Sequence, residues 1–453
     1  MALETRPAGS VATASRRSYP PSPMSTTSRE KPRELYALRY MTRFQCIAER
    51  CEDTCCQMQV NLGAHDVSRL EATVGATEGG KAVVAACVEH REDLPDGAVA
   101  TMRRGSAGTC QFLDADKLCS IIKAHGISSI PDVCHEYPRF FMPSPGGRVD
   151  VLGRLGCPEA ARLCLLADDG LDLVPAEEGI SYLYPVFPDM KLNAYAQPVA
   201  EVRGWAMARL RDIRYPVGAR LLSVAALGAR VDGWFHRGVE EVDAEALRGE
   251  MRVVEAPEEM ERIARAIPAS GSPLLFKVLY SILQAKHAAD SSPRFAAVAL
   301  PVLAAYQEAV QAPAVSRASG GDLWAGIARV VDERRAGLAP AVAAKVDRVV
   351  ERYAIYDWHR APYVLSRTLS ETASPRLLRA ALIRFMALGH PAVWNAPADA
   401  TAMLDEALVE TVQVVARYLE ADPGIYLGLD AFFTAEALGT DAWGRLCALA
   451  QAA

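Results

Sequence analysis

The chain is organised around residues 43 to 60, which read Arg-Phe-Gln-Cys-Ile-Ala-Glu-Arg-Cys-Glu-Asp-Thr-Cys-Cys-Gln-Met-Gln-Val. This segment contains Cys46, Cys51, Cys55 and Cys56, a density of thiols that ordinary core packing does not require. Thiolate is a soft ligand that suits zinc, Cu(I) and iron–sulfur clusters. The segment therefore predicts a metal site.

Four more cysteines extend this candidate ligand set: Cys110, Cys119, Cys134 and Cys157. Each lies in polar, turn-rich sequence. The last three cysteines, Cys87, Cys164 and Cys447, lie in apolar helical runs, and we interpret them as small hydrophobic residues. A structural zinc site closes with four ligands, so eight candidates exceed the need of one zinc ion.

The spacing within the first segment leaves the grouping of its thiols open. If residues 49 to 57 are helical, Cys51 and Cys55 share one face and one centre. Cys56 then points about 100° away around that helix and serves a second ion, unless the helix has already broken. Three other readings compete with a functional metal centre, namely disulfides, a chance enrichment of buried cysteines, and a purely structural zinc domain.

Size and composition indicate a globular protein. The chain has 453 residues, enough for two or three domains, and 51% of them are hydrophobic and 23% charged. A net charge of -6 argues against a dedicated nucleic-acid binder, which normally carries a basic excess. No run approaches the roughly 18 to 20 apolar residues of a membrane span, and the N-terminus lacks an apolar secretion signal. We expect a cytoplasmic protein with reduced thiols.

Three regions differ in character. Residues 1–33 are rich in Ser, Thr, Pro and Arg, and we expect a disordered tail. Residues 34–175 carry the eight candidate ligands, and we expect a small, irregular, cysteine-rich metal-binding domain. Residues 176–453 are expected to form an α-helical domain, so the predicted fold class is mainly α.

Local signals within residues 34–175 predict short elements. Leu35 to Tyr40 and Gln59 to Leu62 favour strands, Asp66 is the expected cap of a helix through Thr73, and residues 81–92 favour a helix. Asp114-Ala115-Asp116 predicts a hairpin turn that brings Cys110 and Cys119 together. Ser120 to His125 is predicted to be a short helix closed by Gly126, and Pro158 predicts a helix that begins just after Cys157.

The second half shows helical periodicity throughout. Prolines are expected to separate the segments, Pro375 among them. The predicted helices span residues 198–212, 217–232, 243–251, 256–267, 273–288, 293–311, 322–334, 340–355, 362–371, 375–388, 400–420 and 429–450. Tyr353, Tyr356, Trp358 and Tyr363 form an aromatic run that fits core packing better than a peptide groove.

The cysteine pattern resembles the flagellin lysine-N-methylase family. The resemblance rests on Cys46, Cys51-Glu52-Asp53-Thr54-Cys55-Cys56, Cys110-Gln111-Phe112-Leu113, Cys119, Cys134-His135-Glu136-Tyr137-Pro138-Arg139 and Cys157-Pro158-Glu159-Ala160-Ala161. It covers about residues 36 to 165. Weaker likeness extends to Arg203–Val231 and to Val412–Asp422, which contains Arg417. The family often has a Trp shortly after the double cysteine, where this chain has Met58-Gln59.

The resemblance implies transfer of a methyl group from S-adenosylmethionine to a lysine amine of flagellin or a flagellin-like protein, with a Cys-ligated 4Fe-4S cluster or zinc. A lysine amine has an ordinary pKa near 10.4, so it must be desolvated or meet a base before it attacks. Glu52, Asp53, Glu136 and Tyr137 are the candidate catalytic residues, and each is alternatively a brace for the cysteine loops. His135 is a possible further ligand.

The site of the methyl donor stays open. No G-x-G-x-x-G follows a predicted strand, so the nucleotide-binding half of a common methyltransferase fold is missing. Either a cluster held by three thiolates offers an open iron to the donor, although the C-x3-C-x2-C spacing is not met, or the donor binds between the two domains. Two further classes compete: a non-catalytic zinc- or iron-binding protein that shares only the cysteine block, and a redox enzyme.

Overall fold

The computed structural model describes residues 34–106, 108–143, 148–176, 196–235, 242–268, 272–289, 292–360, 369–397, 402–420, 422, 424–425, 428 and 440–450. The predicted N-terminal tail and Tyr363 lie outside these residues. Within them the protein is mainly helical, as the sequence predicts. None of the described helices is long and apolar enough to cross a bilayer.

A four-stranded mixed sheet joins the two ends of the N-terminal third. Its strands are β1 (Glu34–Leu38), β5 (Arg139–Pro143), β6 (Arg148–Gly153) and β7 (Leu173–Pro175), in the order β5-β6-β1-β7. Strand β1 is parallel to β6 and antiparallel to β7. The Tyr40 hydroxyl, in the short helix α1 (Arg39–Thr42), donates to the Gly153 carbonyl at 2.6 Å and accepts from the Gly153 N–H at 2.7 Å. The sheet thus holds both ends of the cysteine-rich segment together.

The segment between these strands forms small elements around a three-stranded sheet. The strands pair in the order β2-β4-β3. The elements are η1 (Ala48–Arg50), η2 (Cys55–Gln57), β2 (Asn61–Leu62), α2 (Ala64–Thr73), α3 (Gly80–Cys87), β3 (Val88–His90), η3 (Pro95–Gly97), β4 (Ala100–Met102), α4 (Ser120–His125), η4 (Ile127–Ser129) and α5 (Asp132–Glu136).

Helices make up the rest of the described chain. The helix α6 precedes β7, and the others follow it: α6 (Pro158–Leu166), α7 (Ala196–Leu210), α8 (Val217–Phe235), α9 (Ala244–Glu255), α10 (Pro257–Arg265), α11 (Pro273–Ala289), α12 (Pro293–Gln311), α13 (Pro313–Ala318), α14 (Leu323–Gly337), α15 (Pro340–Arg360), α16 (Leu369–Gly389), α17 (Pro391–Trp394), α18 (Ala402–Val414), the π-helical segment η6 (Val415–Leu419) and α20 (Thr440–Ala450). Proline occupies the first turn of several, where its missing N–H costs nothing.

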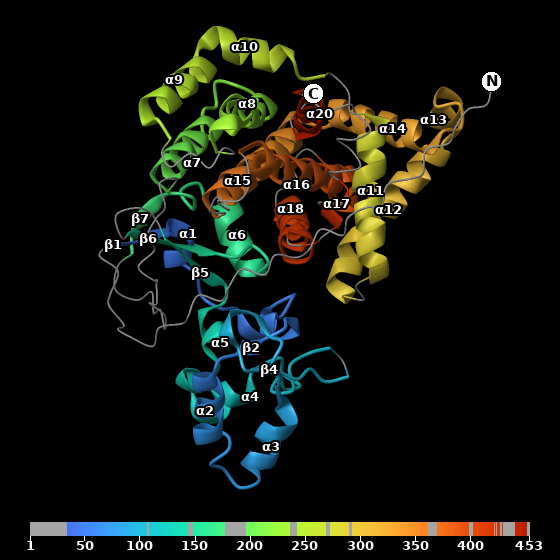
Figure 1. Cartoon of the computed structure of the whole chain (residues 1–453). Helices are drawn as coiled ribbons and strands as arrows, with labels where there is room; N and C mark the ends of the chain where they lie inside the picture. Colours follow the sequence, from blue (N-terminus) through green and yellow to red (C-terminus); the bar gives the residue numbers. More distant parts are fainter. Residues whose placement is uncertain are drawn as a thin grey trace, which may run out of the picture.

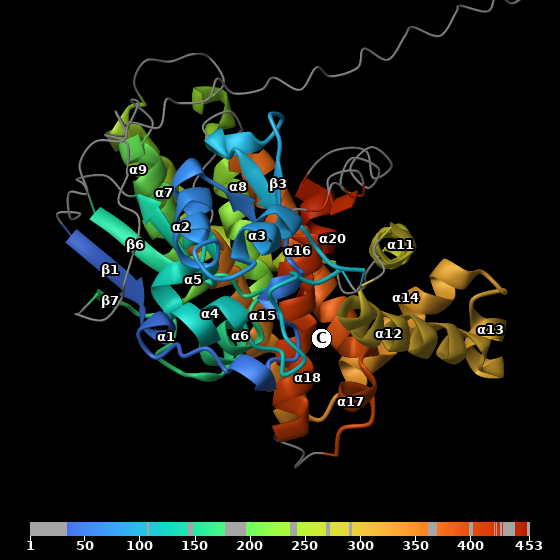
Figure 2. The same ribbon diagram turned by 90° about the horizontal axis from the view of Figure 1, so that it is seen from below.

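Buried side chains form two separate hydrophobic cores. The small core is built by residues 60–130, among them Leu62, Leu70, Ala100 and Ile121. The large core combines the β5-β6-β1-β7 sheet, α1 and α6 with the helices from α7 onward, so it draws on residues from both sides of position 175. Figure 1 shows α2 to α5 grouped below the sheet, apart from the helices of the large core. Figure 2 views this group from below, in front of those helices.

Several local predictions are confirmed and others are wrong. The strands at β1 and β2 and the helix Ser120–His125 with its terminal Gly126 form as predicted. The predicted helix over residues 81–92 ends at Cys87, and β3 follows because Val88 to His90 pair with β4. Asp66 lies inside α2 rather than at its cap, although its carboxylate accepts from the Gly63 N–H at 3.1 Å.

Two predictions in the helical half can also be compared with the structure. Pro375 does not separate two helices but lies inside α16, where its missing N–H removes one intrahelical hydrogen bond. Tyr353, Tyr356 and Trp358 are almost completely buried in α15, as core packing predicts.

Candidate thiol site

A hairpin brings Cys110 and Cys119 together. The Asp114 N–H donates to the Leu118 carbonyl, and the Asp114 carboxylate accepts from the N–H groups of Asp116 and Leu118, all at 2.9 Å. Leu113 and Cys119 pair as an antiparallel bridge. The predicted turn at residues 114–116 is therefore confirmed.

Two more thiols join this pair. The Cys110 N–H donates to the Cys56 carbonyl at 2.7 Å, which ties the hairpin to the first cysteine segment. Cys134, in α5, packs with Cys110 and Cys119 against the small core. Burial raises the pKa of the Cys134 thiol, and the charges of Cys110, Cys56 and Cys119 raise it further. The Cys134 thiol thus lies within electrostatic reach of these three cysteines.

Cys157 belongs to the large core, and the charges of Cys51 and Cys46 reach it. Cys157 precedes α6, and burial raises its pKa to about 12, opposed by the Ala160 and Glu159 N–H groups at the start of that helix. The charges of Cys51 and Cys46 also raise it. The Cys46 sulfur accepts from the Ala48 N–H at 3.4 Å. The helix predicted to start just after Cys157 is confirmed.

Cys55 and Cys56 lie between two groups of thiols. The first is Cys110, Cys119 and Cys134, and the second is Cys46, Cys51 and Cys157. The helix considered for residues 49–57 does not form, because η1 and η2 are separated by Cys51 in an extended conformation and by the turn that follows it. Cys51 and Cys55 therefore do not share a helix face. A hydrogen bond from the Cys55 thiol lowers the pKa of Cys56 to about 7, and the same bond raises the pKa of Cys55.

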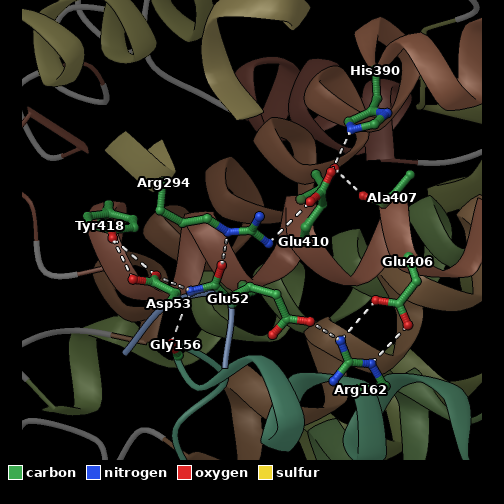
Figure 3. A network of polar contacts seen from close by, with 12 residues as sticks. Glu52, Asp53, Gly156, Arg162, Arg294, His390, Glu406, Ala407, Glu410 and Tyr418 are labelled. Atoms are coloured by element: carbon green, nitrogen blue, oxygen red, sulfur yellow. Dashed lines mark hydrogen bonds and ion pairs between the residues drawn. The ribbon is translucent and has the colours of Figure 1, made fainter. Parts of the chain in front are cut away.

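Asp53 connects the cysteine segment to the C-terminal helices through what we call the Asp53 cluster: Asp53, Gln413, Arg417 and Tyr418. The buried Asp53 carboxylate accepts from the Gln413 side-chain amide at 2.7 Å and from the Tyr418 hydroxyl at 3.1 Å, and lies 3.2 Å from Arg417 Nε. Figure 3 shows Asp53 beside Tyr418, and the contacts of Arg294 and Glu410 that lead on to His390.

Arg417 also holds the backbone that carries the thiols. Its guanidinium donates to the Thr54 carbonyl at 2.8 Å and to the Asp53 carbonyl at 3.3 Å. It reaches the carbonyl of Gly156, the residue before Cys157, at 3.4 Å. One buried cation thus fixes both Cys-bearing loops.

A second arginine anchors the C-terminal end of helix α6. Arg352, in α15, donates to the Cys164 carbonyl at 2.8 Å and to the Asp168 carbonyl at 3.1 Å. These carbonyls belong to the end of α6 and the turn after it, where backbone acceptors lack helical donors. The position of Cys157 therefore depends on α15 and on η6.

The other candidate catalytic residues lie in different surroundings. The Glu52 carboxylate pairs with Arg162 at 2.8 Å on a partly exposed surface, beside Glu406 (Figure 3). Tyr137 is largely enclosed, and burial raises its pKa, while Arg417 lowers it and Cys157 and Cys55 raise it. Glu136 ends α5, and its charge acts on the Arg139 guanidinium. Burial lowers the pKa of His135.

The described residues include one compact group of nonsulfur ligands, which the sequence did not indicate. His65, Asp66 and Asp132 offer ligand atoms within 4.8 Å of one another. Arg69 lies among them, 2.5 Å from the Asp132 carboxylate, and donates to the Ile130 carbonyl at 2.8 Å. This guanidinium already supplies the positive charge that a cation would bring.

Thiols are soft donors of the kind that bind zinc and iron–sulfur clusters. Zinc–sulfur bonds of about 2.3 Å place four sulfur atoms about 3.8 Å apart. In the part of the chain that the structure describes, which includes all eight cysteines, no three thiols lie within 4.8 Å of one another.

The sequence indicated Arg417 only because it lies in Val412–Asp422, the late segment of the family resemblance. It did not indicate Gln413 or Tyr418 as site residues. The available signal was a glutamine in a run of valines, Val412 to Val415, because a buried amide requires a polar partner. Cys87, Cys164 and Cys447 are buried, as their apolar sequence context predicts.

Comparison with known proteins found no relative. No family model, no curated protein and no solved structure matches this chain.

Proposed function

We propose that this chain is an S-adenosylmethionine-dependent protein lysine N-methyltransferase that acts on flagellin or a flagellin-like protein and holds a thiolate-ligated metal centre. The supporting observation is that cysteines from residues 46 to 157, far apart in the sequence, come within electrostatic reach of one another. Residues 34–175 then form the cysteine-rich metal-binding part, and the later helices form the scaffold that holds it.

An iron–sulfur cluster is the metal group we favour. Eight cysteines form a soft donor set, which suits an iron–sulfur cluster as well as zinc. When bound, such a cluster would supply redox or Lewis-acid chemistry. Arg417 lies beside this set and opposes the negative charge that thiolates accumulate.

The contacts rank the four candidate catalytic residues. The Asp53 carboxylate already accepts from Gln413, Arg417 and Tyr418, and Glu52 pairs with Arg162, which favours bracing roles for both. The raised pKa of Tyr137 keeps its hydroxyl protonated, so it would orient a substrate by donating a hydrogen bond. Glu136 is then the group that accepts the proton from the lysine ammonium.

Calorimetry with S-adenosylmethionine on anaerobically purified protein tests this proposal, followed by transfer of a labelled methyl group to flagellin. We expect saturable heat, and labelling that Glu136→Gln abolishes without changing donor binding. Glu49→Gln, an exposed change at a neighbouring acid, is the matched control and should retain labelling.

Absence of both heat and labelling in metal-loaded protein would overturn the methyltransferase proposal. That result would support the alternative, a non-catalytic zinc- or iron-binding protein. The specific observation in favour of the alternative is the engagement of the Asp53 carboxylate in structural contacts with Gln413, Arg417 and Tyr418.

A further inference from the structure

The small core is joined to the large core by two stretches of chain. The two cores share no residue, and α2 to α5 lie apart from the helices of the large core (Figure 1). Among the described residues, no helix or strand of the small core packs extensively against α6 or a later helix. We call the described residues from 56 to 136 the small lobe. Its position therefore depends on the segments that enter and leave it.

The entering segment changes its attachment between Thr54 and Cys56. The Thr54 carbonyl accepts from the Arg417 guanidinium at 2.8 Å and is thus held by η6 of the large core. The Cys56 carbonyl instead accepts from the Cys110 N–H of the small lobe at 2.7 Å. Residues before this boundary are fixed to the helices, and residues after it belong to the lobe.

The leaving segment changes its attachment between Glu136 and Tyr137. Helix α5 ends at Glu136, and its first residue, Asp132, donates its N–H to the Asp66 carboxylate of α2 at 3.0 Å. Tyr137 packs against the large core, and the Pro138 carbonyl accepts from the backbone N–H that follows β6 at 2.7 Å. The boundary here is a single peptide unit.

We propose that the Asp53 cluster locks the orientation of the small lobe, and that release of this cluster lets the lobe turn as a rigid body about residues 136–137. Two fixed attachments define the orientation of a body, whereas one attachment leaves it free to turn. The Asp53 cluster lies directly before the first boundary and is the buried fixture of the entering segment.

The helical side of the cluster has an unusual backbone. Asp53 comes from the entering segment, and its three partners come from the end of α18 and from η6. The Glu420 N–H donates to the Val415 carbonyl five residues earlier, at 3.0 Å, which is the π-helical pattern. Such turns are rare and occur frequently at functional sites. This supports a role for the cluster beyond packing.

Turning of the lobe would act on the proposed site. Glu136 belongs to the small lobe and Tyr137 packs against the large core, so the two residues lie on opposite sides of the boundary. A turn about this boundary changes the position of the Glu136 carboxylate relative to the Tyr137 hydroxyl. This consequence rests on the proposed function, whereas the turning itself does not.

Distances between exposed spin labels test the proposal. In full-length protein, p-acetylphenylalanine replaces Val83 in α3 and Leu300 in α12, both exposed, and carries a nitroxide on its ketone so that native thiols stay unlabelled. Pulsed electron–electron resonance measures this distance between lobe and helices. Labels at Val83 and Ile127 report on the small lobe alone, and labels at Val253 and Leu300 on the large core alone.

We expect one narrow Val83–Leu300 distance in the wild type and a second distance in Asp53→Asn, which keeps the side-chain shape but loses the charge. The distances within the lobe and within the large core should stay unchanged. Asp150→Asn is the matched control, because its buried carboxylate also binds arginines, but within the large core. This control should keep the single wild-type distance.

Far-UV circular dichroism checks folding, and Tyr418→Phe, which removes one hydrogen-bond donor to Asp53, replaces Asp53→Asn if that variant unfolds. A folded variant that keeps only the wild-type Val83–Leu300 distance would overturn the proposal. A new distance within the lobe or within the large core would also overturn it, because the lobe would not be turning as a rigid body.

Failure of this proposal is distinguishable from failure of the proposed function, because the distance measurement requires neither S-adenosylmethionine nor flagellin. A second distance in a protein that transfers no methyl group contradicts only the methyltransferase activity. Methyl transfer by a protein whose Asp53→Asn variant keeps one distance contradicts only the turning of the lobe.

Discussion

At the scale of single residues, Arg417 connects the C-terminal helices to the cysteine loops. Its side chain and that of Asp53 are almost fully buried, at 6% and 0% exposure. Removing one partner of a buried ion pair leaves an uncompensated charge, which usually costs about 3–5 kcal/mol. The pair also aligns the loops that bear Cys55 and Cys157, so the proposed metal centre would depend on a side chain that also stabilises the fold.

We predict that Arg417→Ala lowers the free energy of unfolding by about 3–5 kcal/mol and also reduces metal content. Urea denaturation and metal analysis measure the two effects. Arg162→Ala is the control, because it breaks a more exposed ion-pair group and should cost about 0–1 kcal/mol. Equal losses from the two variants would contradict the special role of Arg417.

Gly156 is a second residue-scale constraint. A Cβ added there would lie 3.2 Å from both Cα and Cβ of Arg417, and the Cα belongs to backbone that cannot yield easily. We predict that Gly156→Ala destabilises the protein by about 1–3 kcal/mol, the usual cost of overpacking. Thermal unfolding measures it.

Gly204→Ala is the matched control for that change. It lies in α7 with nothing within 4 Å of the added carbon, so the substitution should be neutral or stabilising by about 0.5–1 kcal/mol. A Gly156→Ala variant as stable as this control would show that the loop and η6 are not closely packed.

At the scale of elements, a buried charge cluster joins α15 to α16. Burial raises the pKa of the Asp357 carboxyl, but the guanidinium groups of Arg379, Arg360 and Arg376 outweigh this and hold the pKa well below its usual range. Arg379 lies 2.7 Å from the Asp357 carboxylate. The pair thus links two helices that pack side by side in the large core.

This depressed pKa predicts a dependence of stability on pH. A carboxyl group whose pKa is lower in the folded state stabilises the fold above its unfolded pKa, about 3.9, and that contribution is lost as the pH falls further. We predict that Asp357→Asn is less stable than the wild type at pH 7 and that the difference shrinks below pH 4. Urea unfolding at pH 7, 4 and 3 measures it; a constant difference would contradict the assignment.

At the scale of the whole molecule, the two cores allow parts of the protein to open separately. The small core is little more than a dozen buried side chains, and short elements with few apolar contacts rely on added constraints such as metal. All six tryptophans lie between residues 205 and 443, outside it. Tryptophan emission therefore reports only on the helical part.

We predict that removing metal with a chelator speeds hydrogen exchange over residues 46–134, while tryptophan emission and exchange in α15 and α16 stay unchanged. Hydrogen exchange read by mass spectrometry measures this. Restoring metal should restore protection. Simultaneous loss of protection in the large core would show that the two cores unfold as one unit.

Sequence alone determined the helices, because their signals are local. Proline in the first turn, glycine at the end of Ser120–His125 and apolar periodicity act within a few residues, and most predicted segments form. The hairpin at residues 114–116 was predictable for the same reason. Where local signals competed with strand pairing, as at Val88 to His90, the prediction failed.

Only the tertiary structure decided which thiols lie together and what Asp53 contacts. Cys56 meets Cys110, and Arg417 meets Asp53 and Gly156, across long stretches of chain whose approach depends on how whole cores pack. No short-range pattern carries that information, since a buried ion pair needs a partner of opposite charge but does not specify where it lies in the chain.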